Sequence, residues 1–136
     1  GSLGFAISLL PSKSIKMRLI DSFFSVVERA DEACVTVRFH ADHPIYRAHF
    51  PGNPITPGVC ILKMIAELLE LQGQKRLRLA AVKNLKFAAP IIPTDVPTVT
   101  IRFDKRAETE TGIYVKGMVV QGEQVYTKFS LVYQYV

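Results

Sequence analysis

The chain has 136 residues, a mass of 15.2 kDa and 49% hydrophobic residues, and its 17 Lys and Arg against 12 Asp and Glu give a net charge of +5. This length leaves room for one globular core rather than two, and the core is large enough to fold without disulfide or metal staples. The composition excludes intrinsic disorder and a coiled coil. We expect one domain over residues 1–136, with an N-terminal extension at 1–16 that begins with a cloning remnant, Gly1-Ser2.

The sequence predicts a cytoplasmic protein without a membrane anchor. Its N-terminal apolar run, residues 3–10, is shorter than the ~20 residues of a membrane span, and no basic residue precedes it as in a signal peptide. Cys34 and Cys60 stand in apolar contexts without a CxxC spacing, which is typical of two buried thiols in a reducing compartment. The basic residues are scattered among acidic ones, which favours an acidic protein or an anionic small molecule as partner over nucleic acid.

Two strands are expected between residues 20 and 40, with a break at 29–32. Val35, Val37 and Phe39 alternate with polar residues, as in a half-buried strand. The next stretch, 43–58, contains four prolines, so we expect a stiff irregular loop rather than regular structure.

From Pro57 the pattern becomes helical and continues to about Gln72, with Gly73 at the stop position. Apolar side chains of this helix cover almost its whole circumference. Its charged residues fall on one narrow stripe: Lys63, Glu67 and Glu70. A helix of this kind is buried almost all round, so the rest of the chain or a second copy must wrap it.

Four strands are expected after the helix, at 77–87, 96–106, 112–121 and 124–135. Within the second of these, polar and apolar residues alternate, which is typical of an antiparallel sheet with one buried face. Together with the two early strands, the pattern predicts an α+β fold in which about six antiparallel strands wrap a long buried central helix.

The segment from Ala48 to Val59 places His49 on a rigid loop that ends at the helix N-terminus. Free backbone N–H groups and the helix dipole can stabilise negative charge on an oxygen there. An imidazole titrates near neutral pH and can move a proton in both directions, and the apolar helix could line a tunnel for an acyl chain. The residues by themselves also allow a structural histidine in a turn before the helix.

The run His49-Phe50-Pro51-Gly52, followed by Pro54, Pro57, Gly58 and Val59, resembles the signature of the β-hydroxyacyl-acyl-carrier-protein dehydratases of the FabZ and FabA type, which have the hotdog fold. The segment 84–95 is similar to the strand and turn after the helix in that family, with Thr94 where those enzymes more often carry Gly. The resemblance extends over about residues 17–136. It implies a hotdog homodimer or higher oligomer, a (3R)-3-hydroxyacyl thioester substrate on acyl carrier protein, and no metal or organic cofactor.

Carried over by position, the resemblance makes His49 the base that removes the α-proton and passes it toward the departing hydroxyl. The Gly58 amide would polarise the thioester carbonyl. The apolar residues around the loop and helix would contact the substrate: Phe50, Pro51, Pro57, Val59 and Leu62.

Lys63 is a departure from the family pattern, which has an Asp or Glu at this position, contributed to the neighbouring subunit's site. Three outcomes are open. Glu67, one turn further on, could take the role; Lys63 could donate a proton to the hydroxyl if burial lowers its pKa; or dehydration is absent and the chain binds acyl thioesters for another purpose. Lys63 and Glu67 could also form an ordinary i, i+4 ion pair.

Two alternative functions stay open. One is an acyl thioesterase of the same fold, in which Glu67 activates water or attacks the thioester; the other is a non-catalytic acyl-chain binder or assembly partner. For a dehydratase, we expect the acidic carrier to dock on Lys83, Lys86 and the run Lys75–Arg78.

Two further groups are expected to be structural. His40, His43 and His49 have no acid or thiolate ligand set beside them except Asp42, so a zinc site is not expected. Cys60 lies in the first turn of the helix, where a thiolate would be stabilised, but its apolar neighbours favour a packed thiol.

Overall fold

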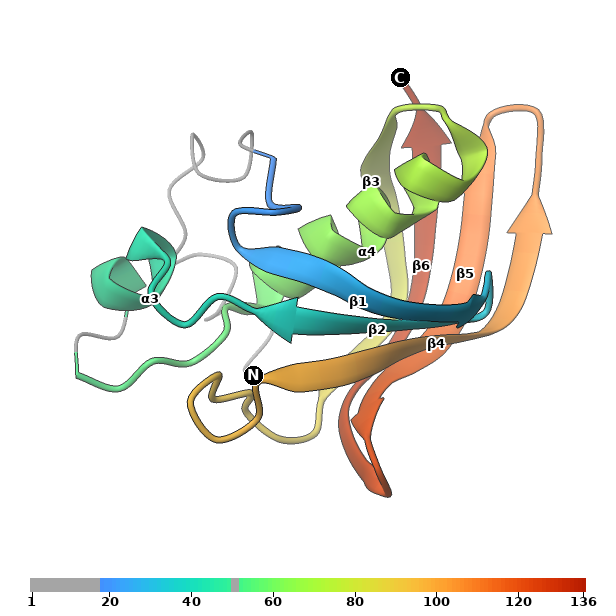
Figure 1. Cartoon of the computed structure of the whole chain (residues 1–136). Helices are drawn as coiled ribbons and strands as arrows, with labels where there is room; N and C mark the ends of the chain where they lie inside the picture. The colour runs from blue at the N-terminus through green and yellow to red at the C-terminus, as the bar shows by residue number, and fades with distance from the viewer. Residues whose placement is uncertain (1–17, 50–51) are drawn as a thin grey trace.

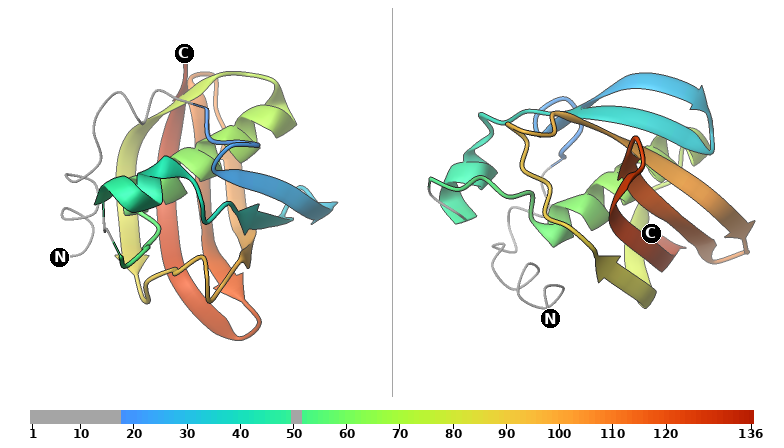
Figure 2. Two further views of the ribbon diagram at one scale, coloured as in Figure 1. Left: turned by 60° about the vertical axis from the view of Figure 1, so that its left-hand side comes forward. Right: turned by 90° about the horizontal axis from the view of Figure 1, so that it is seen from below.

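The structure is a computed structural model that describes residues 18–49 and 52–136. Its elements, in chain order, are β1 (Phe24–Asp31), β2 (Cys34–Phe39), α3 (Pro44–His49), α4 (Gly58–Gly73), β3 (Leu77–Phe87), β4 (Thr98–Glu108), β5 (Gly112–Gln121) and β6 (Gln124–Tyr135). The six strands form one antiparallel sheet in the order β1-β2-β4-β5-β6-β3. This sheet curves around α4 (Figures 1 and 2).

Helix α4 fills the hollow of the sheet and is buried along most of its length. Met64, Ile65 and Leu68 are fully buried in the same core cluster as the inward-facing residues of the strands, which removes a large apolar area from water. The Tyr133 hydroxyl on β6 donates a hydrogen bond of 2.8 Å to the Leu62 carbonyl of α4. The predicted α+β fold, a sheet wrapped around a central helix, is therefore confirmed.

The later strands have the predicted bounds at β3, β5 and β6, and β4 is shifted by two residues toward the C-terminus. The break between the first two strands was predicted at 29–32, which is too early, because β1 continues to Asp31. The Asp31 carboxylate accepts a hydrogen bond of 2.7 Å from the Ala33 amide, and this contact makes the turn into β2.

The stretch 43–58 is not irregular throughout, since residues Pro44–His49 form the helix α3. Pro44 occupies the first helical position, where its missing N–H removes no helical bond. His43 Nδ1 accepts a hydrogen bond of 3.1 Å from the Ile45 amide at the start of this helix. Tyr46 is buried and stacks on Phe23, with ring centroids 5.1 Å apart. The prediction of a continuous loop was wrong here.

Helix α4 begins at Gly58 and ends at Gly73, close to the predicted bounds. The left-handed residue after it is Gln74, with φ of 56°, so Gly73 is the last helical residue rather than the stop residue. The Glu70 carboxylate accepts a hydrogen bond of 2.7 Å from the Leu77 amide, which fixes the start of β3 against the end of α4. Within the described ranges, no helix has the length and apolar character required to cross a membrane.

Candidate functional site

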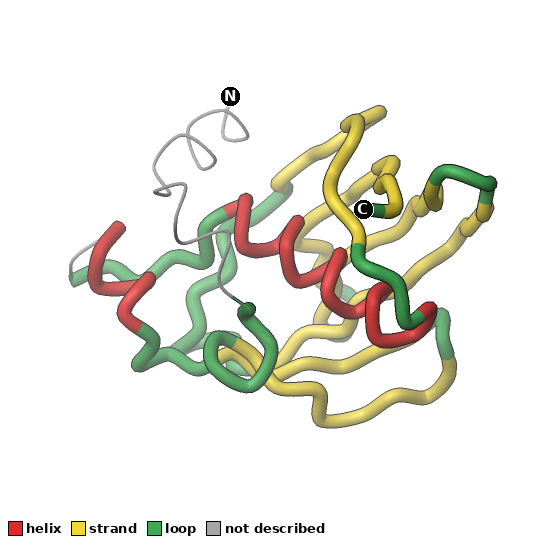
Figure 3. Tube along the Cα trace, turned by 90° about the horizontal axis from the view of Figure 1, so that it is seen from above, coloured by secondary structure: helices red, strands yellow, loops and turns green. Residues whose placement is uncertain are grey.

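A hydrogen bond joins the two segments that carry the predicted catalytic residues. His49 is the last residue of α3, and Gly58 is the first residue of α4. The Tyr46 hydroxyl, one turn before His49, lies 3.0 Å from Thr56 Oγ1, two residues before Gly58, and both side chains are buried. Burial raises the pKa of Tyr46, so its hydroxyl stays protonated and the bond persists at all physiological pH values. Figure 3 shows α3 near one end of the long helix α4, with loop segments around them.

The loop between the two helices has one residue in a left-handed conformation and one backbone hydrogen bond to another segment of the chain. Gly52 has φ of 78°, a left-handed conformation that a residue with a side chain rarely adopts, which explains the glycine of the motif. The Thr56 amide donates a hydrogen bond of 2.8 Å to the Ile91 carbonyl, which connects the first motif to the second. Of the predicted site residues, Phe50 and Pro51 lie outside the described residues, as does the His49 side chain.

The N-terminus of α4 presents backbone donors at Gly58. The amides of Cys60 and Ile61 bond to the Pro57 carbonyl, at 3.0 and 3.3 Å. The amides of Gly58 and Val59 come earlier in the helix, where no intrahelical acceptor exists. In the part of the chain that the structure describes, no side chain caps this helix. The arrangement suits a developing negative charge on a ligand oxygen.

An apolar pocket of about 340 Å³, which we call the lateral pocket, begins next to this N-terminus. One wall is a single face of α4: Val59, Leu62, Lys63 and Ala66. The other wall comes from β3 and β6: Leu77, Arg78, Leu79 and Tyr133. The structure thus brings together Val59 and Leu62 among the predicted substrate contacts. Ala66 and the strand residues were not among the predicted substrate contacts. Ala66 follows Val59 at helical spacing and could have been found from that signal.

Lys63 and Glu67 have different surroundings although both lie on the stripe of charged residues. Lys63 is half-buried in the wall of the lateral pocket. Glu67 is fully buried, and its two carboxylate oxygens accept hydrogen bonds from the backbone amides of Leu19, at 2.7 Å, and Ile20, at 2.8 Å. Across the described ranges, ion pairs are found elsewhere but not between Lys63 and Glu67, so the alternative of an i, i+4 ion pair is wrong.

His40 and His43 make structural contacts, and Cys60 is a packed thiol. His40 Nε2 lies 2.7 Å from Ser25 Oγ, and burial lowers the pKa of His43, which keeps its Nδ1 available as an acceptor. Among the described side chains, no cluster of three His, Cys, Asp or Glu could hold a metal ion. Cys60 is buried, and burial raises the pKa of its thiol to about 12, as expected of a packed thiol. Cys34 is only half-buried, contrary to the prediction that both thiols are buried.

A curved antiparallel sheet around one central helix defines the hotdog fold, shared by thioesterases and dehydratases of acyl thioesters. Solved structures agree with this class. The dehydratase heterocomplex ApeI:P from Xenorhabdus doucetiae has a TM-score of 0.56 at 14% identity, over 79% of this chain and 92% of that chain. A thioesterase from Haemophilus influenzae has a TM-score of 0.56 at 12% identity, over 83% of this chain and 78% of that chain. At these identities the likeness shows the fold alone.

The chain belongs to the ApeI-like dehydratase family, because the family model described as ApeI dehydratase matches residues 25–123. Curated relatives are similar over a comparable length. The 3-hydroxyacyl-[acyl-carrier-protein] dehydratase FabZ of Streptococcus equi subsp. zooepidemicus is 30% identical over 111 residues, which cover 76% of this chain and 77% of the relative. FabZ of a Caulobacter species is 28% identical over 122 residues, which cover 75% of this chain and 71% of the relative.

Proposed function

We propose that this protein dehydrates (3R)-3-hydroxyacyl thioesters of acyl carrier protein to trans-2-enoyl thioesters. The observation that carries the proposal is the position of the lateral pocket: Val59, the residue after Gly58, belongs to its wall. A thioester whose carbonyl oxygen accepts a hydrogen bond from the Gly58 amide therefore has an apolar space beside it for the acyl chain. The FabZ relatives carry this reaction class in their names, and the family is that of a dehydratase.

In the proposed reaction, His49 removes the α-proton as the base. The electron pair moves toward the carbonyl, and the Gly58 amide and the dipole of α4 stabilise the negative oxygen that develops. When the electron pair returns, the β-hydroxyl leaves as water with the proton that His49 gives back. No cofactor is required, because the reaction moves only a proton and a hydroxyl group.

The first experiment follows the ultraviolet absorbance of the conjugated enoyl thioester with wild type, His49→Ala and His40→Ala. We expect His49→Ala to lose dehydration by about 10²-fold or more, the contribution typical of a general base. The His40 ring is already paired with the Ser25 hydroxyl, so the His40→Ala variant controls for the loss of an imidazole. Equal activity of wild type and His49→Ala would refute the assignment of the base.

We propose that Lys63 donates a hydrogen bond to the departing hydroxyl within its own subunit, whereas the resemblance implies that the family's carboxylate at this position serves the neighbouring subunit's site. Lys63 lies one helical turn beyond Val59 on the same face of α4, inside the lateral pocket. Glu67 is not carried into the reaction, because both of its oxygens are already engaged by backbone amides. An ammonium can donate to a leaving oxygen as a protonated carboxyl group does.

Lys63→Met tests this role, with Lys116→Met as a control that removes an exposed lysine of β5. We expect Lys63→Met to lower kcat by about tenfold to a hundredfold while KM changes little, as for an interaction made in the transition state. A Lys63→Met variant with unchanged kcat, together with a Lys63→Glu variant that is faster than wild type, would contradict it. That result would assign Lys63 to a pocket wall without chemistry.

The carrier is proposed to dock on the exposed cations of the turn before β3, Lys75 and Arg76, beside Arg78 at the wall of the lateral pocket. Lys83 and Lys86 are also exposed, but they stand on β3, the strand along which the homodimer is proposed to form. Charge reversal at Lys75 and Arg76 should raise KM for carrier-bound substrate and leave KM for a pantetheine thioester unchanged. Equal effects on both substrates would refute the docking surface. We place this encounter in the cytoplasm, which the free thiols of Cys34 and Cys60 support.

A homodimer is proposed to form along β3. This strand is at the end of the sheet order, and within the described residues only β6 pairs with it. Leu79 and Val82 on this strand are 38% and 40% exposed, unusual for residues of their size and type. Light scattering after size exclusion should give twice the mass of the chain, and Val82→Asp should reduce it to the monomer mass. A monomeric wild type would refute the homodimer.

A thioesterase reaction with Glu67 is not favoured, because a carboxylate bonded to two backbone amides in the core cannot reach a thioester or a water in the lateral pocket. Release of free thiol from saturated acyl thioesters tests this alternative. Hydrolysis that Glu67→Gln abolishes and His49→Ala preserves would favour a thioesterase over the dehydratase proposed.

A further inference from the structure

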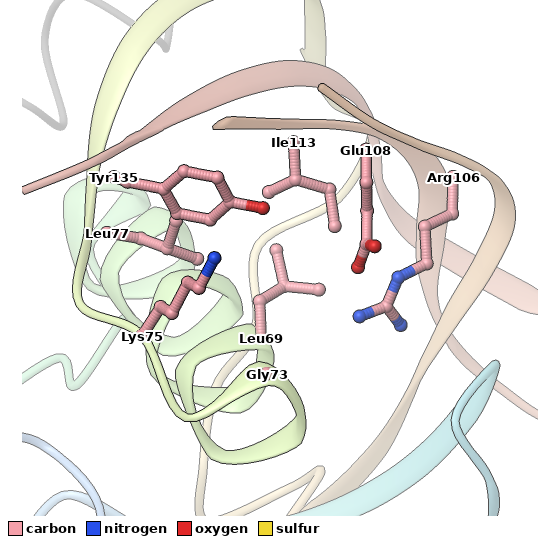
Figure 4. Close-up of a pocket in the computed structure, with 8 residues that line it drawn as sticks. All are labelled: Leu69, Gly73, Lys75, Leu77, Arg106, Glu108, Ile113 and Tyr135. Carbon is pink, nitrogen blue, oxygen red and sulfur yellow. The ribbon is translucent and has the colours of Figure 1, made fainter. Parts of the chain in front are cut away.

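The lateral pocket has a neighbour along the same helix. A second pocket of about 280 Å³, which we call the end pocket, lies beside the last turns of α4 (Figure 4). Its helix wall contains Leu69 and Gly73, which continue the face formed by Val59, Leu62 and Ala66 in the lateral pocket. The two pockets therefore follow one another along a single face of α4.

Leu77 is the residue that both pockets share on the strand side. It is the first residue of β3 and is 9% exposed. Its amide donates to the Glu70 carboxylate, and it is paired in register with Tyr135 of β6. With its backbone fixed by α4 on one side and β6 on the other, the Leu77 side chain stays in place between the two spaces.

The two pockets differ in chemistry. Except for Lys63 and Arg78, the lateral pocket is apolar or aromatic. The end pocket has an apolar floor, Leu69, Leu77 and Ile113, but also a charged lining, Lys75, Arg106 and Glu108. Figure 4 shows these three charged side chains around the floor. Lys75 and Glu108 are exposed, so an acyl chain end that enters can lie on the apolar floor while these charged groups keep their contact with water.

We infer that Leu77 sets the longest acyl chain that the protein accepts, by closing the lateral pocket against the end pocket. The inference rests on the proposed function in that it takes the acyl chain as the occupant of the lateral pocket. Along the axis of α4, the distance from Ala66 to Gly73 is roughly 10 Å. An extended acyl chain of up to about eight carbons has this length. Removal of the Leu77 side chain joins the space beside this part of α4 to the lateral pocket.

The test measures calorimetric binding of saturated acyl-pantetheine thioesters, from short to long in steps of two carbons, to wild type, Leu77→Ala, Leu77→Phe and Leu85→Ala. Leu85 is the matched control, because it is a partly buried leucine of the same strand that lines neither pocket. For wild type we expect affinity to rise with length and then fall at a limit. Leu77→Ala should bind the first chain beyond that limit roughly tenfold more tightly, the factor for burial of about two further methylene groups.

Leu77→Phe should move the limit to shorter chains, and Leu85→Ala should leave the limit unchanged. Leu77→Val, which deletes a single methylene group, replaces Leu77→Ala if that variant does not fold and should extend the limit by a smaller step. An identical limit in wild type and in the folded Leu77 variants would overturn the inference, as would an equal extension in Leu85→Ala. The dehydration assay is separate: binding with a Leu77-dependent limit but without turnover would refute the dehydratase and leave the limit assigned to Leu77.

Discussion

Glu67→Gln is predicted to destabilise the fold strongly and to leave the chemistry intact. The carboxylate is fully buried and accepts hydrogen bonds from two backbone amides, those of Leu19 and Ile20. A glutamine side chain offers only one oxygen, so its NH₂ group must face one of these N–H groups and leave it without an acceptor. A hydrogen bond to a charged group contributes about 1.5–3 kcal/mol, and a buried unpaired donor adds about 1–3 kcal/mol.

The expected loss is about 2.5–6 kcal/mol, a large part of the roughly 7–20 kcal/mol that a chain of this length has in total. At this size it corresponds to a decrease in Tm of about 10–20 °C. Glu70→Gln is the matched control, because the Glu70 carboxylate is half-buried and accepts one backbone amide, that of Leu77. It should cost about 1 kcal/mol.

Thermal unfolding followed by circular dichroism gives both values, and the dehydration assay is run below the lower Tm. We expect kcat of folded Glu67→Gln to stay within about twofold of wild type, since the side chain does not touch substrate. A Tm within about 2 °C of wild type, combined with loss of turnover, would refute the reasoning. That outcome would make Glu67 a catalytic residue rather than an anchor of the N-terminal segment.

Three further changes test individual contacts. Burial raises the pKa of Cys60 from 9.0 to about 12, so the thiol loses its proton at lower pH in the unfolded chain than in the folded one. The stability of the wild type should therefore fall as the pH rises from about 9 to about 12. Denaturant titrations should show a smaller fall for Cys60→Ala. Tyr46→Phe removes the bond to Thr56; we expect a loss of about 1 kcal/mol by urea unfolding and a lower kcat, because the bond joins the segments of the proposed base and amide. Gly117→Ala should prevent or severely impair folding, since a Cβ there would collide with the backbone of β4, whereas Gly73→Ala has open space and should leave the Tm unchanged.

The sheet and its helix could be predicted because their signals are local. Alternation with period two gave β3, β5 and β6 their bounds, and the apolar run after Pro57 gave α4. The helix α3 was missed because the count of prolines over 43–58 hid their positions: the residues between Pro44 and Pro51 contain none, and a proline at the first position is compatible with a helix.

The environment of the charged residues on α4 could not be predicted. Periodicity places Lys63 and Glu67 on the same stripe, but it does not say which segment covers that stripe. Glu67 is covered by Leu19 and Ile20, more than forty residues earlier in the chain, and Lys63 faces β3 and β6. Contacts at this separation depend on how the elements pack together, which a pattern read along one segment does not contain.

The bonds of Glu67 also have a consequence for local motion. Amides outside helices and strands usually exchange their hydrogens quickly. The Leu19 amide donates to a carboxylate inside the core and Leu19 itself is buried, so water reaches this amide only when that core opens. Its exchange rate should therefore match those of the central residues of α4, and this amide reports the opening of the sheet around its helix from a position that lies before the first strand.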